Sequence, residues 1–551
     1  MLTGLAFAQN SLLFTKGINM LTFFETWNKG ELPNLNKHYE ADFACLKSMG
    51  VEAIRLPIHF ELLMEPYDTG TIYDFVLEKL DQVCDWAEKY QIYLIIDDHS
   101  FNTPEYDLNP PSVQLYKEHL ESVWRQIASR YNNRSKYIIY EILNEPKSNG
   151  EIASKWIKLQ QGIIDLIRSY DPERDIVVTS ADFSSIDTLV KMKPYKDPNL
   201  IYSFHFYEPM LFTHQGATWV GKGMANTSDI PFPYERARMP KLNKEAAADG
   251  WVQSMYNEYY NIGTAKYINQ RIKKAADWGK KNNVRIFCGE IGAKVWTNPV
   301  DRLAWINTTR TALEANKISY CCWGLDGSDG FLKSDKAGMI FPDDIDEAVT
   351  KAYGFNMPSS EALKLANDSL KKFPQKPYIV YDEVEGKFTS AYPFNTKITK
   401  VSDSHERCFV MSYPQEQASI DIYLLKAITS KFKENEKSLV ISFDVKFTDK
   451  SQSFEVLLVD SDGGKKELPW TKRYDLKACD YALNKWITAE IPVSRFDNNW
   501  GAWSNVEQAW YDLPCEFTWS RFEKLTFNFN DHTGGSSKGE LYIDNIVIKK
   551  K

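Results

Sequence analysis

Two glutamates in this chain each stand shortly after an apolar run with the character of a β-strand. Glu145 follows the run 137–143, and Glu290 follows the run 284–288. Two carboxyl groups that face each other can break a glycosidic bond, because one protonates the leaving oxygen while the other attacks the anomeric carbon or activates water. The two glutamates are far apart in the sequence, so such a site requires a fold that brings the ends of distant strands together.

Other polar and aromatic side chains also follow strand-like runs. They are Arg55, His99, Asn144, His205, Tyr207 and Trp323. Arg55, His205 and Tyr207 would hold the second glutamate ionised, because positive charge and hydrogen-bond donors favour a carboxylate. Asn144 would bind a sugar hydroxyl, and Trp323 offers a flat face for a pyranose. Each also fits a structural role alone, such as an ion pair or core packing, so the joint pattern carries the prediction.

The runs that precede these residues belong to a regular alternation of strands and helices over residues 10–355. Eight strand-like segments occur, at 13–18, 52–56, 93–97, 137–143, 176–179, 200–204, 284–288 and 318–323. The helical patterns between them repeat apolar residues at intervals of three and four. This predicts an α/β fold, a (β/α)8 TIM barrel, whose site lies at the carboxyl ends of the strands. A doubly wound sheet is the alternative, but no glycine-rich turn follows the first strand.

One connection in the predicted barrel is unusually long. About 55 residues, rich in aromatic residues, proline and glycine, separate His205 from the next helix near Tyr267. Loops of more than about 15 residues are usually binding loops or lids. We therefore expect the stretch 212–219 to form a wall of a binding groove, and the whole excursion, 208–262, could instead block one end of it.

The sequence pattern changes after Pro358. Residues 374–377 predict a stiff linker between a catalytic domain, 9–373, and a second domain, 378–551. In the second domain apolar and polar residues alternate with a period of two, which predicts an all-β jelly-roll sandwich. Five tryptophans crowd into one part of it, either to bind sugars or to fill its core. They are Trp486, Trp500, Trp503, Trp510 and Trp519.

The composition excludes several classes of protein. Charged residues make up 25% and the net charge is -8, which argues against a nucleic-acid partner. The longest apolar runs fall well short of the roughly 18 residues that a membrane-spanning helix needs. Residues 1–8 resemble the end of a cleaved signal peptide, so we expect a secreted protein, extracellular or periplasmic.

The cysteines predict neither a metal site nor a dense disulfide framework. Cys288, Cys321 and Cys322 lie in strand-like runs and are expected to be buried thiols, while Cys479 and Cys515 could form a disulfide. Their spacing lacks the pairs of ligands that bind zinc. We expect no metal and no organic cofactor.

The motifs Asn144-Glu145-Pro146 and Gly289-Glu290 resemble those of glycoside hydrolase family 5, a family of retaining (β/α)8 barrels that includes many cellulases. The resemblance covers about residues 10–355. The functional set of that family maps, in chain order, onto Arg55, His99, Asn144, Glu145, His205, Tyr207, Glu290 and Trp323. It implies that Glu145 is the acid/base and Glu290 the nucleophile. It also suggests His214 and Trp219 as groove residues, while Asp97-Asp98 departs from the family pattern.

The resemblance implies a glycosidase that acts on a β-linked polysaccharide or oligosaccharide. An endo-β-1,4-glucanase is the first expectation, because the family is dominated by such enzymes and a long groove suits a polymer. Mannan, xyloglucan and mixed-linkage glucan remain alternatives, as does exo action. A non-catalytic sugar-binding protein is the alternative from another class. The last strand, GELYIDNIVI, resembles that of a carbohydrate-binding module.

Overall fold

A computed structural model of the protein describes residues 12–551, except 28, 30–32, 36, 102–110, 148–149, 334–340, 369–372, 383, 386–388, 400, 403, 406, 414–417, 425, 461–467, 500, 505–506, 508 and 530–537. The predicted signal remnant, 1–8, therefore lies outside the described residues. The chain divides into two compact units. One comprises 1–29, 40–334 and 341–363, and the other comprises 30–39, 335–340 and 364–551.

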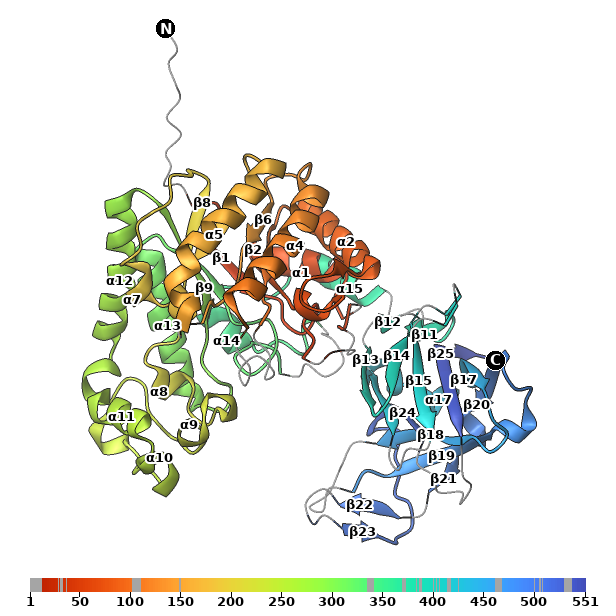
Figure 1. Ribbon diagram of the computed structural model, residues 1–551. Helices are drawn as coiled ribbons and strands as arrows, with labels where there is room; N and C mark the ends of the chain where they lie inside the picture. The colour runs from red at the N-terminus through yellow and green to blue at the C-terminus, as the bar shows by residue number, and fades with distance from the viewer. Residues whose placement is uncertain are drawn as a thin grey trace. The chain divides into compact units, whose positions relative to one another are not determined.

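The first unit is a closed barrel of parallel strands, as the sequence predicted (Figure 1). The eight strands are β1 (Lys16–Asn19), β2 (Ala53–Ile58), β5 (Tyr93–Asp98), β6 (Ile138–Glu141), β7 (Ile176–Thr179), β8 (Leu200–Phe206), β9 (Arg285–Ile291) and β10 (Ser319–Cys322). They pair in sequence order, and β1 closes the barrel against β10. Each of the eight predicted segments overlaps one strand of the barrel.

Helices surround the barrel and bury their apolar faces against it (Figure 1). The principal helices are α1 (Glu40–Ser48), α2 (Asp74–Tyr90), α4 (Val113–Tyr131), α5 (Gly150–Tyr170), α12 (Ala265–Asn282), α13 (Pro299–Ala315) and α14 (Glu347–Ala352). In α2, Val76, Leu80, Val83 and Ala87 are buried on one face. Gln91 ends this helix in a left-handed conformation.

Inside the barrel, one buried residue from each strand or its approach forms an apolar layer. The layer consists of Phe14, Ala53, Ile95, Ile139, Val177, Ile201, Phe287 and Cys321. Side chains alternate along a strand, so the next inward positions lie two residues further on. There the interior becomes polar, with Arg55, Asp97 and Glu141, all fully buried. The apolar layer therefore supports a charged layer at the carboxyl end of the barrel.

The long connection after β8 contains helices that the sequence analysis did not predict. It contains α8 (Met210–Thr213), α9 (Lys222–Ala225), α10 (Lys244–Ala248) and α11 (Gly250–Ile262), which group together in Figure 1. Asn243 accepts a hydrogen bond from the backbone N–H of Ala246 and thereby caps α10. Asp249 caps α11 in the same way. These caps stabilise short helices that lack a long apolar period.

The second unit is an antiparallel β domain, again as predicted. One sheet contains β11 (Tyr378–Asp382), β12 (Val384–Glu385), β14 (Lys397–Thr399), β15 (Cys408–Tyr413), β17 (Leu439–Phe447), β20 (Trp486–Pro492) and β25 (Gly539–Lys550). The other contains β13 (Thr389–Phe394), β16 (Ser419–Leu424), β18 (Ser453–Asp460), β19 (Thr471–Lys477), β21 (Asp497–Asn498) and β24 (Phe522–Asn528). Phe443 of the first sheet contacts Phe454 and Phe527 of the second, so the two inner faces share one core.

The suggested disulfide between Cys479 and Cys515 does not form. All eight cysteines are free thiols, and Cys288, Cys321 and Cys322 are buried as expected. Cys479 lies two residues beyond the end of β19, whereas Cys515 donates to the carbonyl of Thr471, the first residue of β19. Strands rise about 3.3 Å per residue, so the length of this strand keeps the two sulfur atoms apart.

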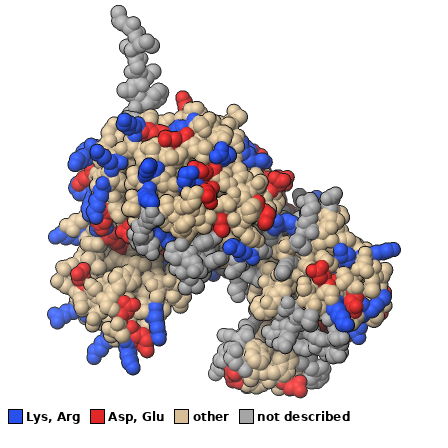
Figure 2. Space-filling view, viewed as in Figure 1, with Lys and Arg blue, Asp and Glu red and all other residues tan. Residues whose placement is uncertain are grey.

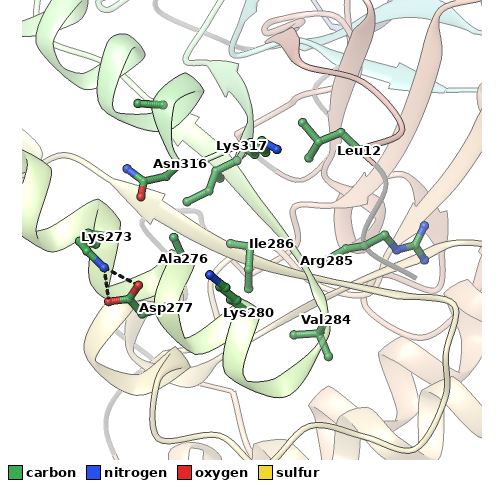
Figure 3. A pocket seen from close by; sticks show the side chains of 13 residues that line it. Leu12, Lys273, Ala276, Asp277, Lys280, Val284, Arg285, Ile286, Asn316 and Lys317 are labelled. Atoms are coloured by element: carbon green, nitrogen blue, oxygen red, sulfur yellow. Dashed lines mark hydrogen bonds and ion pairs between the residues drawn. The ribbon is translucent and has the colours of Figure 1, made fainter. Parts of the chain in front are cut away.

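A hollow of about 570 Å³ opens at the amino-terminal ends of β9 and β10 (Figure 3). Arg285 and Lys317 line it, and Lys273 and Asp277 form an ion pair at its edge. In TIM barrels the functional end is the carboxyl end of the strands, so this hollow lies at the wrong end for the predicted site. Within the described part of the chain, no helix is both long and apolar enough to cross a membrane.

Candidate active site

The structure brings the two predicted catalytic glutamates together at the carboxyl end of the barrel. Glu145 lies just beyond β6, and Glu290 lies near the end of β9. One oxygen of each carboxyl group and one ring nitrogen of His205 all lie within 4.8 Å of one another. The side chain of Glu145 is 19% exposed and that of Glu290 is 6% exposed. A substrate at the mouth of the barrel would therefore reach Glu145 more readily.

Arg55 connects the charged layer to the site. Its Nη1 donates to Oε1 of Glu290 at 2.9 Å, and its Nη2 donates to Oδ1 of Asn144 at 2.8 Å. It also binds Glu141 through two hydrogen bonds, of 2.7 and 2.9 Å. Nη1 donates to Asn19 as well, at 2.9 Å. Arg55 thus combines the two roles that the sequence left open, an ion pair inside the barrel and a positive charge beside a catalytic carboxylate.

The two glutamates have different hydrogen-bond partners. The hydroxyl of Tyr207 donates to Oε2 of Glu290 at 2.7 Å, so this carboxyl group receives a donor on each oxygen. His205 makes its shortest contact with Glu145 instead, 2.6 Å from Nδ1 to Oε1, and lies 3.5 Å from Glu290. The sequence assigned His205 to Glu290, and the structure adds a shorter contact with Glu145. The ring bridges the pair and lies closer to Glu145.

Gly289 makes room for this arrangement. A Cβ atom at this position would lie 2.9 Å from Nε2 of His205 and 3.0 Å from the hydroxyl of Ser203. Both distances are shorter than ordinary van der Waals contact. Any larger residue before Glu290 would therefore push His205 out of its place.

Burial dominates the titration of the site. It raises the pKa of Glu145 to about 7, with a contribution from the negative charge of Glu141 that Arg55 opposes. Burial also raises the pKa of Glu290 to about 7. His205, Arg55 and the hydroxyl of Tyr207 oppose this rise, because they favour the ionised form. Glu290 has the partners that stabilise a carboxylate, so the shared proton of the pair belongs on Glu145.

The pKa of His205 is lowered to about 4, chiefly by burial, so its ring is neutral at pH 7. A neutral ring that donates from Nδ1 to Oε1 of Glu145 leaves Oε2 free to carry the acidic proton. Glu145 is thereby oriented as a proton donor while Glu290 stays ionised.

A row of stacked rings extends from the site. His99 lies between Trp323 and His59, with ring centroids 5.4 and 5.7 Å apart. Its Nδ1 donates to Asp97 at 2.7 Å, and Asp97 also contacts Arg55 at 3.0 Å. The departure at Asp97 from the family pattern thus fixes both His99 and Arg55. The row ends at Trp27, whose indole contacts His59 and is 47% exposed.

The two residues suggested in the insertion differ in their surroundings. His214 is buried and contacts the ring of Tyr207, with centroids 5.1 Å apart, so it lies behind the site. Trp219 is 60% exposed. Its ring lies 4.5 Å from the ammonium group of Lys294 and 6.3 Å from the ring of Trp296, which is 50% exposed.

Sequence reasoning missed two groups that shape this site, Asn19 and Glu141, and it named Asp97 without giving it a role. Asn19 and Glu141 each lie within a strand rather than after it, where an apolar run conceals a polar residue. A count of two positions along the strand from the apolar layer would have placed Asp97 and Glu141 inside the barrel.

Comparisons with known proteins agree with this geometry. The family model described as Cellulase (glycosyl hydrolase family 5) matches residues 16–329. Endoglucanase 3 of Fibrobacter succinogenes is 29% identical over 338 residues, which are 58% of this chain and 51% of that protein. The match thus spans about half of that relative. Cellodextrinase A of Ruminococcus flavefaciens is 27% identical over 314 residues, which are 56% of this chain and 84% of that protein.

Among solved structures, the cellulose synthase subunit Z (CcsZ) of Clostridioides difficile superposes with a TM-score of 0.51 and 26% identity. The superposition covers 62% of this chain and 99% of that one. More than half of the chain therefore matches one family in sequence, and its fold is the barrel that the motifs predicted. The chain belongs to glycoside hydrolase family 5, the cellulase family.

Proposed function

We propose that this glycoside hydrolase is a retaining endo-β-1,4-glucanase. The observation that carries the proposal is the pair Glu145 and Glu290, with carboxyl oxygens within 4.8 Å of each other and different hydrogen-bond partners. Retaining enzymes hold their carboxyl groups about 5–5.5 Å apart, whereas inverting enzymes need a wider gap for water. The short separation supports direct attack by one of the carboxylates.

In the proposed reaction an oxygen of Glu290 attacks the anomeric carbon and forms a glycosyl ester. The bond from this carbon to the leaving oxygen breaks, and Glu145 gives its proton to that oxygen. Glu145, now ionised, then removes a proton from water, whose oxygen attacks the same carbon and releases Glu290. Two displacements at one carbon restore its configuration. Arg55 and Tyr207 hold Glu290 in place throughout.

Two features support a β-glucan chain as the substrate. Related proteins carry the names endoglucanase and cellodextrinase. The exposed indole of Trp27 extends the row of rings beyond Trp323, and such flat surfaces suit several sugar rings in a row. Mannan, xyloglucan and mixed-linkage glucan are alternatives, because they differ from cellulose in the configuration at one carbon, in side branches and in some linkages, respectively. The name cellodextrinase supports the alternative of exo action on short chains.

Product analysis on a panel of polysaccharides tests this proposal. Carboxymethylcellulose, barley β-glucan, xyloglucan and galactomannan are incubated with the enzyme and with the Glu290→Gln variant. We expect a ladder of oligosaccharides from the two glucans, with retained anomeric configuration by proton NMR, and none with the variant. Release from galactomannan alone would overturn the substrate. Binding without hydrolysis would favour the sugar-binding alternative.

We further propose that the protein is secreted and that its β domain is a carbohydrate-binding module. A polysaccharide is too large to enter a cell, so an enzyme that cleaves it acts in the periplasm or outside. A module that holds the polymer raises the concentration of chains near the active site. Deletion of residues 376–551 should reduce retention on insoluble cellulose while hydrolysis of short oligosaccharides continues.

A further inference from the structure

Of the five tryptophans that crowd into one part of the β domain, Trp500 lies outside the described residues, and the structure separates the other four into different classes. Trp519 packs against Phe432, Phe517 and Phe522, so it belongs to an aromatic cluster within the domain. Trp486 stacks on a histidine ring at 3.8 Å, which covers one of its faces. Both have their ring surface occupied by neighbours within the domain.

Two other tryptophans have free surface. Trp503 is 43% exposed and Trp510 is 57% exposed. They occupy opposite positions on β22 (Ala502–Ser504) and β23 (Ala509–Tyr511), a separate two-stranded hairpin that is visible in Figure 1. Opposite residues of an antiparallel pair project from the same face, with Cβ atoms about 4.5–5.5 Å apart. The two indoles therefore share one face of the hairpin, which we call the hairpin platform.

The hairpin platform has a local support. Gly501 has φ of +84°, and a Cβ atom there would lie 2.8 Å from the indole nitrogen of Trp510. The indole thus rests against the glycine backbone. The N–H of Gly501 donates to the carbonyl of Leu513 at 2.9 Å and closes the base of the hairpin. Trp510 is therefore held in place before any ligand arrives, which reduces the entropy that binding costs.

The acidic residues around the hairpin platform restrict which partners it can bind. Between Arg495 and Arg521 the sequence contains no lysine or arginine. Acidic residues occur there instead, at Asp497, Glu507, Asp512 and Glu516, and their side chains are exposed. Figure 2 shows red and no blue at the end of the domain where this hairpin lies. Anionic membranes and nucleic acids would be repelled.

We infer that the hairpin platform formed by Trp503 and Trp510 binds a neutral β-linked glycan chain. The indoles stack on the apolar faces of successive pyranose rings, and the carboxylates beside them accept hydrogen bonds from sugar hydroxyls. A glycan offers both features and carries no charge that the acidic residues would repel. This inference rests on the proposed function, since it takes the substrate of the barrel as the ligand of the hairpin.

Retention of the full-length protein on insoluble cellulose tests the inference, with affinity electrophoresis in barley β-glucan, xyloglucan and galactomannan as a second readout. In the double variant Trp503→Ala/Trp510→Ala we expect binding to weaken about tenfold or more, as truncation of central tryptophans commonly does. The variant Trp503→Tyr/Trp510→Tyr keeps two aromatic faces and should retain most of the binding. Phe394→Ala is the matched control, because Phe394 is an aromatic residue of the same domain that is 54% exposed but lies on β13 and not on the hairpin.

The readouts separate the two proposals. Hydrolysis of a soluble cello-oligosaccharide should be the same in all variants, since none alters the barrel site, and an equal melting temperature shows that the β domain is folded. Unchanged retention of the double alanine variant would overturn the inference even if the enzyme cleaves cellulose. The inference would also be overturned if no glycan retards the wild-type protein, or if the double alanine variant loses self-association and keeps its glycan binding. If the double alanine variant loses binding but the wild-type protein prefers galactomannan, the hairpin platform is supported and only the proposed β-glucan substrate is wrong.

Discussion

Arg55 and Glu141 form a bidentate ion pair inside the barrel, with nitrogen–oxygen distances of 2.7 and 2.9 Å. Both side chains are fully buried. Two parallel hydrogen bonds fix the plane of a guanidinium group, which a single contact does not. The same guanidinium binds Glu290. Glu141 therefore positions the residue that holds the nucleophile, although it has no place in the set that the sequence assigned to the site.

We expect Glu141→Gln to act on both the rate and the pH dependence. Loss of the bidentate pair lets Arg55 turn, so kcat/KM should fall by up to about 100-fold. The charge of Glu141 raises the pKa of Glu145. Its removal lowers that pKa, so the acid loses its proton earlier and the alkaline limb of the kcat/KM profile should move to lower pH.

Glu61→Gln is the control for this prediction. Glu61 is as deeply buried as Glu141, and burial raises its pKa to about 8, so it is largely neutral at pH 7. It accepts a hydrogen bond from the backbone of Phe101 and does not contact Arg55. The control should keep the pH profile of the wild type. An unchanged alkaline limb in Glu141→Gln would contradict the assigned role.

The sequence predicted the barrel well because its strands and helices follow from local patterns of apolar residues. Each strand is a local apolar run, and a parallel barrel places the end of every run at one mouth. Glu145 and Glu290 could thus be paired without any knowledge of the distance between them. The helical insertion was missed because its helices are short, and capping residues such as Asn243 and Asp249 give the main local signal.

Contacts between strands could not be predicted in the same way. His205 was assigned to Glu290, yet a ring at the end of β8 lies between two carboxyl groups, and small rotations decide which one it meets. The suggested disulfide between Cys479 and Cys515 also depends on such contacts. Their separation depends on the strand that lies between their positions, and composition contains no information about it.

The two glutamates should respond differently to the quality of the leaving group. Glu290→Gln removes the nucleophile, so it should abolish turnover of every substrate. Glu145→Gln removes the acid, which contributes about 10²–10⁴-fold, and an aryl glycoside with an acidic phenol needs no proton in the first step. We therefore expect a burst of phenol from this variant and slow release of sugar afterwards.

Stopped-flow measurement of the burst with a dinitrophenyl cello-oligoside checks this prediction, and unactivated cellotetraose serves as the comparison. Asp277→Asn, at the opposite end of the barrel, is the matched carboxylate control and should behave as the wild type. A burst from Glu290→Gln rather than from Glu145→Gln would reverse the two roles.

Tyr207→Phe should shift the acidic limb of the pH profile. The hydroxyl of Tyr207 donates to Glu290 and favours its ionised form, so its loss raises the pKa of Glu290. The nucleophile must be ionised to attack. The acidic limb of kcat/KM should therefore move to higher pH, and the loss of activity should be greatest below pH 7.

Tyr267→Phe is a close control for the loss of that hydroxyl. Tyr267 donates to Glu208 at 2.7 Å, the same distance as Tyr207 to Glu290. The Tyr267→Phe substitution removes an equivalent hydrogen bond at a position away from Glu145 and Glu290. If both variants shift the acidic limb equally, the effect arises from general loss of stability and not from Glu290.

Metal ions should inhibit this enzyme and not assist it. Among the residues that the structure describes, Glu145, His205 and Glu290 bring three donor atoms within 4.8 Å of one another. A neutral imidazole with two carboxylates is a donor set that zinc accepts. No step of the proposed reaction uses a metal, so the protein should keep full activity after dialysis against EDTA. Added Zn²⁺ should compete with cello-oligosaccharides.

The pH dependence of zinc inhibition follows from the same pKa values. The two carboxyl groups have a pKa of about 7, and protons compete with a metal for them, while His205 with a pKa of about 4 is already neutral. Inhibition should therefore strengthen as the pH rises through 7. Mg²⁺ prefers oxygen ligands in an octahedral shell and should have little effect at the same concentration. Activity that EDTA removes and a metal restores would contradict the proposed mechanism, because a carboxylate pair alone would then be insufficient.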